Sequence, residues 1–74
     1  MERRVVGKVK RVNGPVITLE EVHDAQMMEM VRIGEQQLVG EVIKLFDDEA
    51  TVQVYEDATG ICPGDNVYGS GSSL

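Results

Sequence analysis

Residues 38–55 read LVGEVIKLFDDEATVQVY, and this stretch decides the fold. In its second half Ala50, Val52 and Val54 alternate with threonine, glutamine and tyrosine, which is the period-two pattern of a strand with one buried face. Asp47 and Asp48 separate this pattern from the apolar run before it, and two residues of this kind suit a tight turn between antiparallel strands. The stretch therefore predicts a β-hairpin.

The first strand of this hairpin has apolar residues on both faces. Alternation puts Val39, Ile43 and Leu45 on one face and Gly40, Val42 and Phe46 on the other. We expect Val39 or Ile43 to lie in the core, together with Val52 and Val54 of the second strand.

The segment from Arg3 to Val12 carries four valines whose spacing does not fit a single strand face, with Gly7 among them. A strand that bends or bulges near Gly7 would accommodate them, as closed barrels commonly require. Asn13-Gly14-Pro15 predicts a turn, because Asn and Gly tolerate a positive φ and Pro cannot donate to a central ladder. The β-branched run 16–19 predicts the returning strand.

The remaining sequence predicts short strands separated by turns. Residues 20–26 are polar and read as a loop, and 27–33, followed by Gly34, read as a strand. Turns are expected at 56–60 and 63–66, and residues 67–68 would form a last short strand. Five or six short strands without a convincing helix predict an all-β fold, and a small closed β-barrel is favoured because closure removes exposed edges.

The last six residues, GSGSSL at 69–74, have the composition of a linker. We expect residues 1–68 to form the barrel and 69–74 to be a tail. This tail is either the natural exit into a further domain or a remnant of expression, and the sequence leaves both open.

Length and composition limit what such a chain can do. It has 74 residues and a net charge of −6, from 7 basic and 13 acidic residues, which is room for one domain. A domain of this size buries only about 60% of its unfolded surface and commonly needs further support. Cys62 is the only cysteine, so an internal disulfide is excluded and a reducing, intracellular setting is expected. No apolar run approaches the roughly 20 residues of a membrane-spanning helix, which leaves a partner surface as the expected support.

The charge also argues against nucleic acid as a partner, because affinity for phosphates comes from clustered Lys and Arg. The one basic cluster lies near the N-terminus and reads as the solvated face of a strand; it comprises Arg3, Arg4, Lys8, Lys10 and Arg11. Three aromatic residues in the whole chain offer little for base stacking.

No catalytic, cofactor-binding or metal-binding residue is predicted. His23 has no second histidine as a partner, and the acidic run 47–49 lacks the alternating spacing of a calcium loop. Cys62 has no basic neighbour to activate its thiol, and the glycines at 69 and 71 lack the Gly-Lys-Ser/Thr ending of a phosphate loop. The methionines at 27, 28 and 30 are either core filler or part of a contact surface.

Four blocks of sequence resemble one protein family. Residues 9–17, VKRVNGPVI, resemble the "V-x-x-V-x-G-P-V-V" opening of rotary ATPase catalytic subunits. Residues 25–35, AQMMEMVRIGE, are similar to the "A-x-M-Y-E-L-V-R-V-G" segment of the V/A-type A subunit, and residues 38–43 continue it. Residues 52–60, VQVYEDATG, resemble the family's "I-Q-V-Y-E-D-T-S/T-G", and Pro63-Gly64-Asp65 follows in order. The sequence departs from the family at Met28, where Tyr is common, and at 36–37.

The resemblance implies a six-stranded barrel, the N-terminal domain of the catalytic A subunit of an archaeal or vacuolar-type rotary ATPase or ATP synthase. Such barrels alternate with those of B subunits in a ring that holds the hexameric head together, in the cytoplasmic, peripheral part of a membrane-bound complex. ATP and Mg²⁺ would bind in other domains of the parent, so no catalysis is expected in this chain. The isolated domain is expected to be mainly monomeric.

The alternative function from another class is a free-standing OB-like barrel that binds single-stranded nucleic acid or a ligand. The acidic charge and the missing aromatic platform count against it. An enzyme in its own right is a further alternative, and the missing phosphate loop counts against that one.

Overall fold

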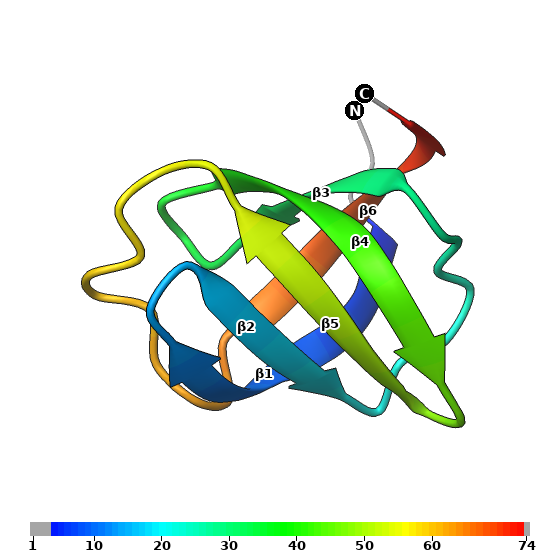
Figure 1. The fold of residues 1–74 in the computed structure, drawn as a ribbon, viewed down its shortest axis with the longest axis horizontal. Coiled ribbons are helices and arrows are strands. Elements are labelled where there is room, and N and C mark those ends of the chain that lie inside the picture. The colour runs from blue at the N-terminus through cyan, green and yellow to red at the C-terminus, as the bar shows by residue number, and fades with distance from the viewer. Residues whose placement is uncertain (1–3, 74) are drawn as a thin grey trace.

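Residues 4–73 are described by the computed structural model, with side chains to residue 71; Arg3 of the predicted basic cluster lies outside the described residues. Six strands and no helix make up this part of the chain (Figure 1). The strands are β1 (Arg4–Asn13), β2 (Val16–Glu20), β3 (Glu29–Ile33), β4 (Leu38–Phe46), β5 (Glu49–Val54) and β6 (Asn66–Ser73). They close into an antiparallel barrel in the order β1-β2-β5-β4-β3-β6, which confirms the predicted all-β, six-stranded closed barrel. Within residues 4–73 no helix has the length and apolar character that crossing a membrane requires.

The two predicted hairpins are present. β4 and β5 pair from Gly40↔Val54 to Phe46↔Glu49 across the turn at 47–48. Asp47 adopts a φ of 55° there, a left-handed conformation that Asp tolerates better than most residues. β1 and β2 pair across the Gly14-Pro15 turn, with Asn13 opposite Val16.

The predicted inward face of β4 is wrong. Leu38, Gly40 and Val42 point into the barrel, whereas Val39 is half-buried and Ile43 is 41% exposed. Glycine carries no hydrophobic signal, so the face that contains Gly40 looks weak in the sequence. The space beside Gly40 is occupied by the side chain of Val52, since a Cβ at Gly40 would lie only 2.7 Å from Cγ1 of Val52.

A break in strand register explains the rest of the β4 pattern. Its register with β5 shifts between Val42 and Lys44, so Ile43 is the extra residue of a bulge. After the bulge Leu45 packs against the core, although strict alternation puts it on the face opposite Val42.

The bulge predicted near Gly7 is confirmed. The register of β1 with β6 shifts between Val5 and Gly7, and this shift lets Val6 and Val9 both be fully buried. A second shift, between Val9 and Arg11, lies in the pairing of β1 with β2. β1 thus turns sharply enough to pair with a strand on each side.

The core fills the barrel from all six strands and one loop. Val52 and Val54 belong to it, as predicted. Its buried members are Val6, Val9, Ile17, Leu19, Val31, Ile33, Leu38, Val42, Ala50, Val52, Val54, Ile61 and Val67. Ile61 comes from the β5–β6 loop.

The last strand is longer than predicted. β6 runs to Ser73 and pairs with β3 from Ile33↔Val67 to Glu29↔Ser73, so Gly69 and the serines after it lie in the sheet. The linker-like composition of this segment does not indicate a strand, because Gly69 is needed for close packing and not for flexibility. A Cβ on Gly69 would lie 2.6 Å from Oε2 of Glu29 and 2.7 Å from Cγ1 of Val6. The division into a barrel and a tail domain stays a prediction.

Val54→Asp should abolish cooperative folding. Val54 is 4% exposed, and an unpaired buried carboxylate costs several kcal/mol, which is comparable to the whole stability of about 5 kcal/mol expected for so small a domain. Thermal unfolding followed by circular dichroism measures this. Gln53→Asp, one residue earlier and half-buried, is the matched control. Equal melting temperatures for the two variants would contradict the assigned facing of β5.

Candidate functional site

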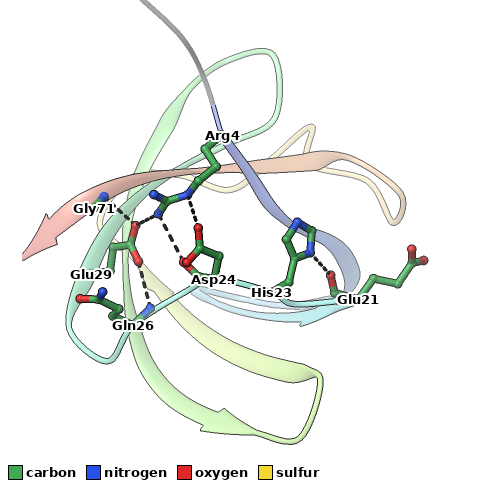
Figure 2. Close-up of polar contacts among 7 residues, drawn as sticks. All are labelled: Arg4, Glu21, His23, Asp24, Gln26, Glu29 and Gly71. Atoms are coloured by element: carbon green, nitrogen blue, oxygen red, sulfur yellow. Dashed lines mark hydrogen bonds and ion pairs between the residues drawn. The ribbon is translucent and has the colours of Figure 1, made fainter.

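Among residues 4–71 one acidic side chain is buried. Glu29, at the start of β3, is 1% exposed, and both of its carboxylate oxygens accept hydrogen bonds (Figure 2). Oε1 accepts from the backbone N–H of Gln26 at 2.9 Å, and Oε2 accepts from the N–H of Gly71 at 2.7 Å. The guanidinium of Arg4 donates to Oε2 through Nη2 at 3.0 Å.

Arg4 extends this arrangement to the loop before β3. Its Nε lies 3.4 Å from Oδ2 of Asp24, and its Nη2 also donates to the Asp24 carbonyl at 3.3 Å. The Arg4 side chain is 44% exposed and that of Asp24 67%, so the cluster is buried at Glu29 and open to solvent at its other end. We call Arg4, Asp24, Gln26, Glu29 and Gly71 the Glu29 cluster. It ties together the first residue of β1, the loop before β3, the start of β3 and the end of β6.

Local backbone conformation brings these groups together. Asp24 and Met28 adopt left-handed φ values of 62° and 67°, and the N–H of Glu29 donates to the carbonyl of Gln26 at 3.2 Å. This tight turn folds Gln26 back over the Glu29 side chain. Gly71 has a φ of 81°, which favours glycine, and it directs its N–H at the carboxylate.

The Glu29 cluster is suited to holding structure and not to chemistry. A buried carboxylate is stable when several donors satisfy it, and here three donors do so. Sequence reasoning placed Glu29 in a family block and gave it no role. The sequence feature that could have indicated a buried carboxylate is an acidic residue within an apolar strand, together with glycines in the strand that pairs with it.

The glycines at 69 and 71 do not fit a phosphate group. The N–H of Gly71 is already bound to Glu29, and the same carboxylate lies against Gly69. A phosphate there would meet a negative charge in place of a cradle of free N–H groups.

The other candidate residues from the sequence, His23, the acidic run 47–49 and Cys62, make no hydrogen bond or ion pair with the Glu29 cluster. His23 is exposed, and its Nδ1 lies 3.2 Å from the carbonyl of Glu21 (Figure 2). In the acidic run, Glu49 is bound to Lys10 while Asp47 and Asp48 are exposed. Cys62 is exposed, with Sγ 3.7 Å from the carbonyl of Gly60. In the described part of the chain no three His, Cys, Asp or Glu side chains converge as a metal site would require.

The three methionines differ in exposure, and none of them is among the residues of the core or packed against it. Met27 and Met28 are each 52% exposed, while Met30 is half-buried. The N–H of Met28 donates to the carbonyl of Val42 at 2.8 Å, so this loop sits against β4 next to the exposed Ile43. Met27 and Met28 are therefore surface residues and not core filler.

Three surface groups in the described part of the chain have shifted pKa values. A hydrogen bond and the charge of Lys10 hold the pKa of Glu49 below its usual range. The hydroxyl and N–H of Thr59 lower the pKa of Asp57. Tyr55 donates its hydroxyl to Oε1 of Glu41, and this bond raises the pKa of Tyr55.

Comparison with known proteins assigns the barrel to a family. Residues 9–71 match the β-barrel domain of the ATP synthase alpha/beta family. The chain belongs to this family.

Curated relatives narrow the match to the A subunit of A-type ATP synthases. The A subunit from Metallosphaera sedula is 54% identical over 92% of this chain, and that from Ignicoccus hospitalis is 53% identical over 92%. The A subunit from Methanococcus maripaludis strain C5 is 47% identical over 95% of the chain. These matches confirm the predicted resemblance to the N-terminal barrel of this subunit. The chain spans 12% of the length of the first of these relatives.

A solved structure has the same fold. The assembled ATPase of the type III secretion system of enteropathogenic E. coli superposes with a TM-score of 0.82, over 90% of this chain and 16% of that one. The sequence identity is 24%, so this likeness concerns the fold alone.

Glu29→Gln should destabilise the barrel by about 1–3 kcal/mol, the usual cost of a buried polar group without a partner. Both oxygens of Glu29 face N–H donors, so either orientation of the new amide sets its NH₂ against a donor. Denaturant unfolding measures the change. The control is Glu35→Gln, which removes the same charge from an exposed turn. Equal stability of the two variants would show that the contacts of Glu29 contribute nothing.

Tyr55 should ionise above its ordinary pKa of 10.0. Since the folded pKa is the higher one, the stabilisation from this bond is complete below the unfolded pKa and is lost as pH rises through the folded pKa. A pH titration of tyrosinate absorbance in a Tyr68→Phe background isolates Tyr55. Glu41→Gln should lower its pKa, and Glu35→Gln should leave it unchanged. A pKa that did not respond to Glu41→Gln would rule out this hydrogen bond as the cause.

Proposed function

We propose that this chain is a structural assembly domain of the catalytic A subunit of a V/A-type, proton- or sodium-translocating ATP synthase or ATPase. The observation that carries the proposal is the match, at 54% identity over 92% of the chain, to the A subunit of an A-type ATP synthase, of which the barrel is only 12%. The chain corresponds to a small part of a much longer subunit and folds as a closed barrel. Such a module is suited to holding neighbouring chains together.

The barrel's partners in this proposal are the barrels of B subunits. A closed barrel has no free strand edge, so neighbours contact it through side chains. Large apolar side chains are available on its surface for such contacts. They are Met27, Met28, Ile43, Phe46 and Tyr55, with exposed fractions from 41% to 67%.

Catalysis belongs elsewhere in the parent protein under this proposal. The only glycines that suggested a phosphate loop are bound to Glu29 or packed against it. ATP and Mg²⁺ therefore act in the parts of the parent that this chain does not include. The barrel contributes to the peripheral, cytoplasmic head of the complex by fixing the arrangement of neighbouring subunits.

Sedimentation velocity at moderate salt tests the assembly role. Alone, the chain should be mainly monomeric, because its natural contacts are with unlike chains and its charge of −6 makes copies repel one another. Mixed with the cognate B subunit, it should move into a heavier boundary that neither component forms alone.

Two outcomes would contradict this proposal. A stable hexamer of the chain alone would show that contacts between identical barrels are sufficient to form a ring without the B subunit. Failure to co-sediment with a large excess of the B subunit would remove the assembly role.

A further inference from the structure

A single row of residues crosses four strands on the outside of the barrel. Arg11 on β1 pairs with Thr18 on β2, Thr18 pairs with Thr51 on β5, and Thr51 pairs with Lys44 on β4. The neighbours Ile17, Val52 and Ala50 are buried, so the row itself faces outward. It has a cation at each end and two hydroxyl groups between them.

Two bulges produce this row. The register shift between Val9 and Arg11 lies in β1, and the shift between Val42 and Lys44 lies in β4. A bulge re-aims the residues that follow it, and here each is followed by the cation that ends the row. Three strand spacings of about 4.8 Å separate the two cations, which is roughly 14 Å measured around the sheet. Both cations line one hollow, so one short segment of another protein can reach both.

Neither of the two cations is held by a direct ion pair, although the charge of Arg11 also acts on Glu49. None of the ion pairs among residues 4–73 involves Arg11 or Lys44. Glu49, the acidic residue beside the row, is bound to Lys10 at 2.6 Å. The charged residues around the row itself, Arg11, Lys44 and Glu49, carry a charge of +1 on a chain whose net charge is −6, and the exposed Asp47 and Asp48 lie at the adjoining hairpin turn.

The row also has a hollow and an exposed aromatic ring. A depression of about 160 Å³ is lined by all four row residues together with Phe46, Glu49 and Ala50. Phe46 is 67% exposed, the most exposed of the large apolar side chains in the described part of the chain. A partner side chain entering here meets cations, hydroxyl donors and an apolar ring at once.

We propose that this hollow docks an acidic segment of a partner protein, with carboxylates on Arg11 and Lys44 and an apolar side chain on Phe46. Charge complementarity favours an acidic occupant, since the row ends in two cations that no direct ion pair holds. A short protein segment fits better than single-stranded nucleic acid. Two cations match a few carboxylates and one ring matches an apolar side chain, whereas a long phosphate backbone would extend past the hollow onto a chain with a net charge of −6. The inference does not rest on ring assembly, because it concerns one face of the barrel whichever protein brings the segment.

The test is a titration of the ¹⁵N-labelled chain, at low salt, with a short glutamate-rich peptide that has a leucine at its centre. Amide shifts should change at Arg11, Thr18, Thr51 and Lys44, and the effect should fade at high salt. The double variant Arg11→Gln/Lys44→Gln should weaken binding roughly tenfold, since each exposed ion pair contributes up to about fivefold. Both side chains are exposed, so the variant's melting temperature should match that of the parent.

The matched control removes two positive charges elsewhere. Lys8 and Arg32 are exposed and lie outside the hollow, so Lys8→Gln/Arg32→Gln should bind the peptide as the parent does. Equal weakening in both double variants would mean diffuse attraction and overturn the proposal, as would shift changes confined to other strands. Tighter binding of a short oligothymidine at the same residues would assign the hollow to nucleic acid. Co-sedimentation with the B subunit is measured separately, so either proposal can fail without the other.

Discussion

Closure of the sheet is the constraint on which the rest of this structure depends. β1 must pair with β2 along one side and with β6 along the other, and a straight strand cannot do both in so small a barrel. The two register shifts in β1 supply the curvature, and the shift in β4 supplies it on the opposite side. Val6 and Val9 both reach the core because of this bending.

Closure also explains why a charged group is buried in so small a core. Where β3 meets the end of β6, glycine leaves room beside the sheet and the carboxylate of Glu29 fills it. Its donors come from three separate segments, so the interaction is satisfied only when β1, β3 and β6 are all in place. A methyl-bearing residue at Gly69 would collide with this carboxylate, and the glycine is therefore structural.

The sequence predicts this fold well wherever period and turn chemistry agree. The alternation of Ala50, Val52 and Val54, the Asn-Gly-Pro turn and the valine spacing around Gly7 each lead to the observed element. Prediction fails where glycine replaces a side chain. Because Gly40 has no side chain, the sequence does not reveal the buried face of β4, and Gly69 gives a paired strand the composition of a linker.

The candidate sites are less predictable from the sequence than the fold. Glu29 acquires its role only through contacts with Arg4 and Gly71, which are 25 and 42 residues away in sequence. The row from Arg11 to Lys44 depends on strand order and on two bulges, and a single-sequence pattern specifies neither.

The pairing of Arg4 with Gly69 has a mechanical consequence. β1 begins beside Gly69, in the middle of β6, and the two strands run antiparallel side by side (Figure 1). Tension applied to these two ends therefore separates β6 from β3 at Ser73 and β1 from β6 at Arg4, and it loads the backbone hydrogen bonds of each pair one after another and not the whole ladder in shear. The bonds that Glu29 accepts from Arg4 and Gly71 join β1, β3 and β6 at this corner, so they bear the load together.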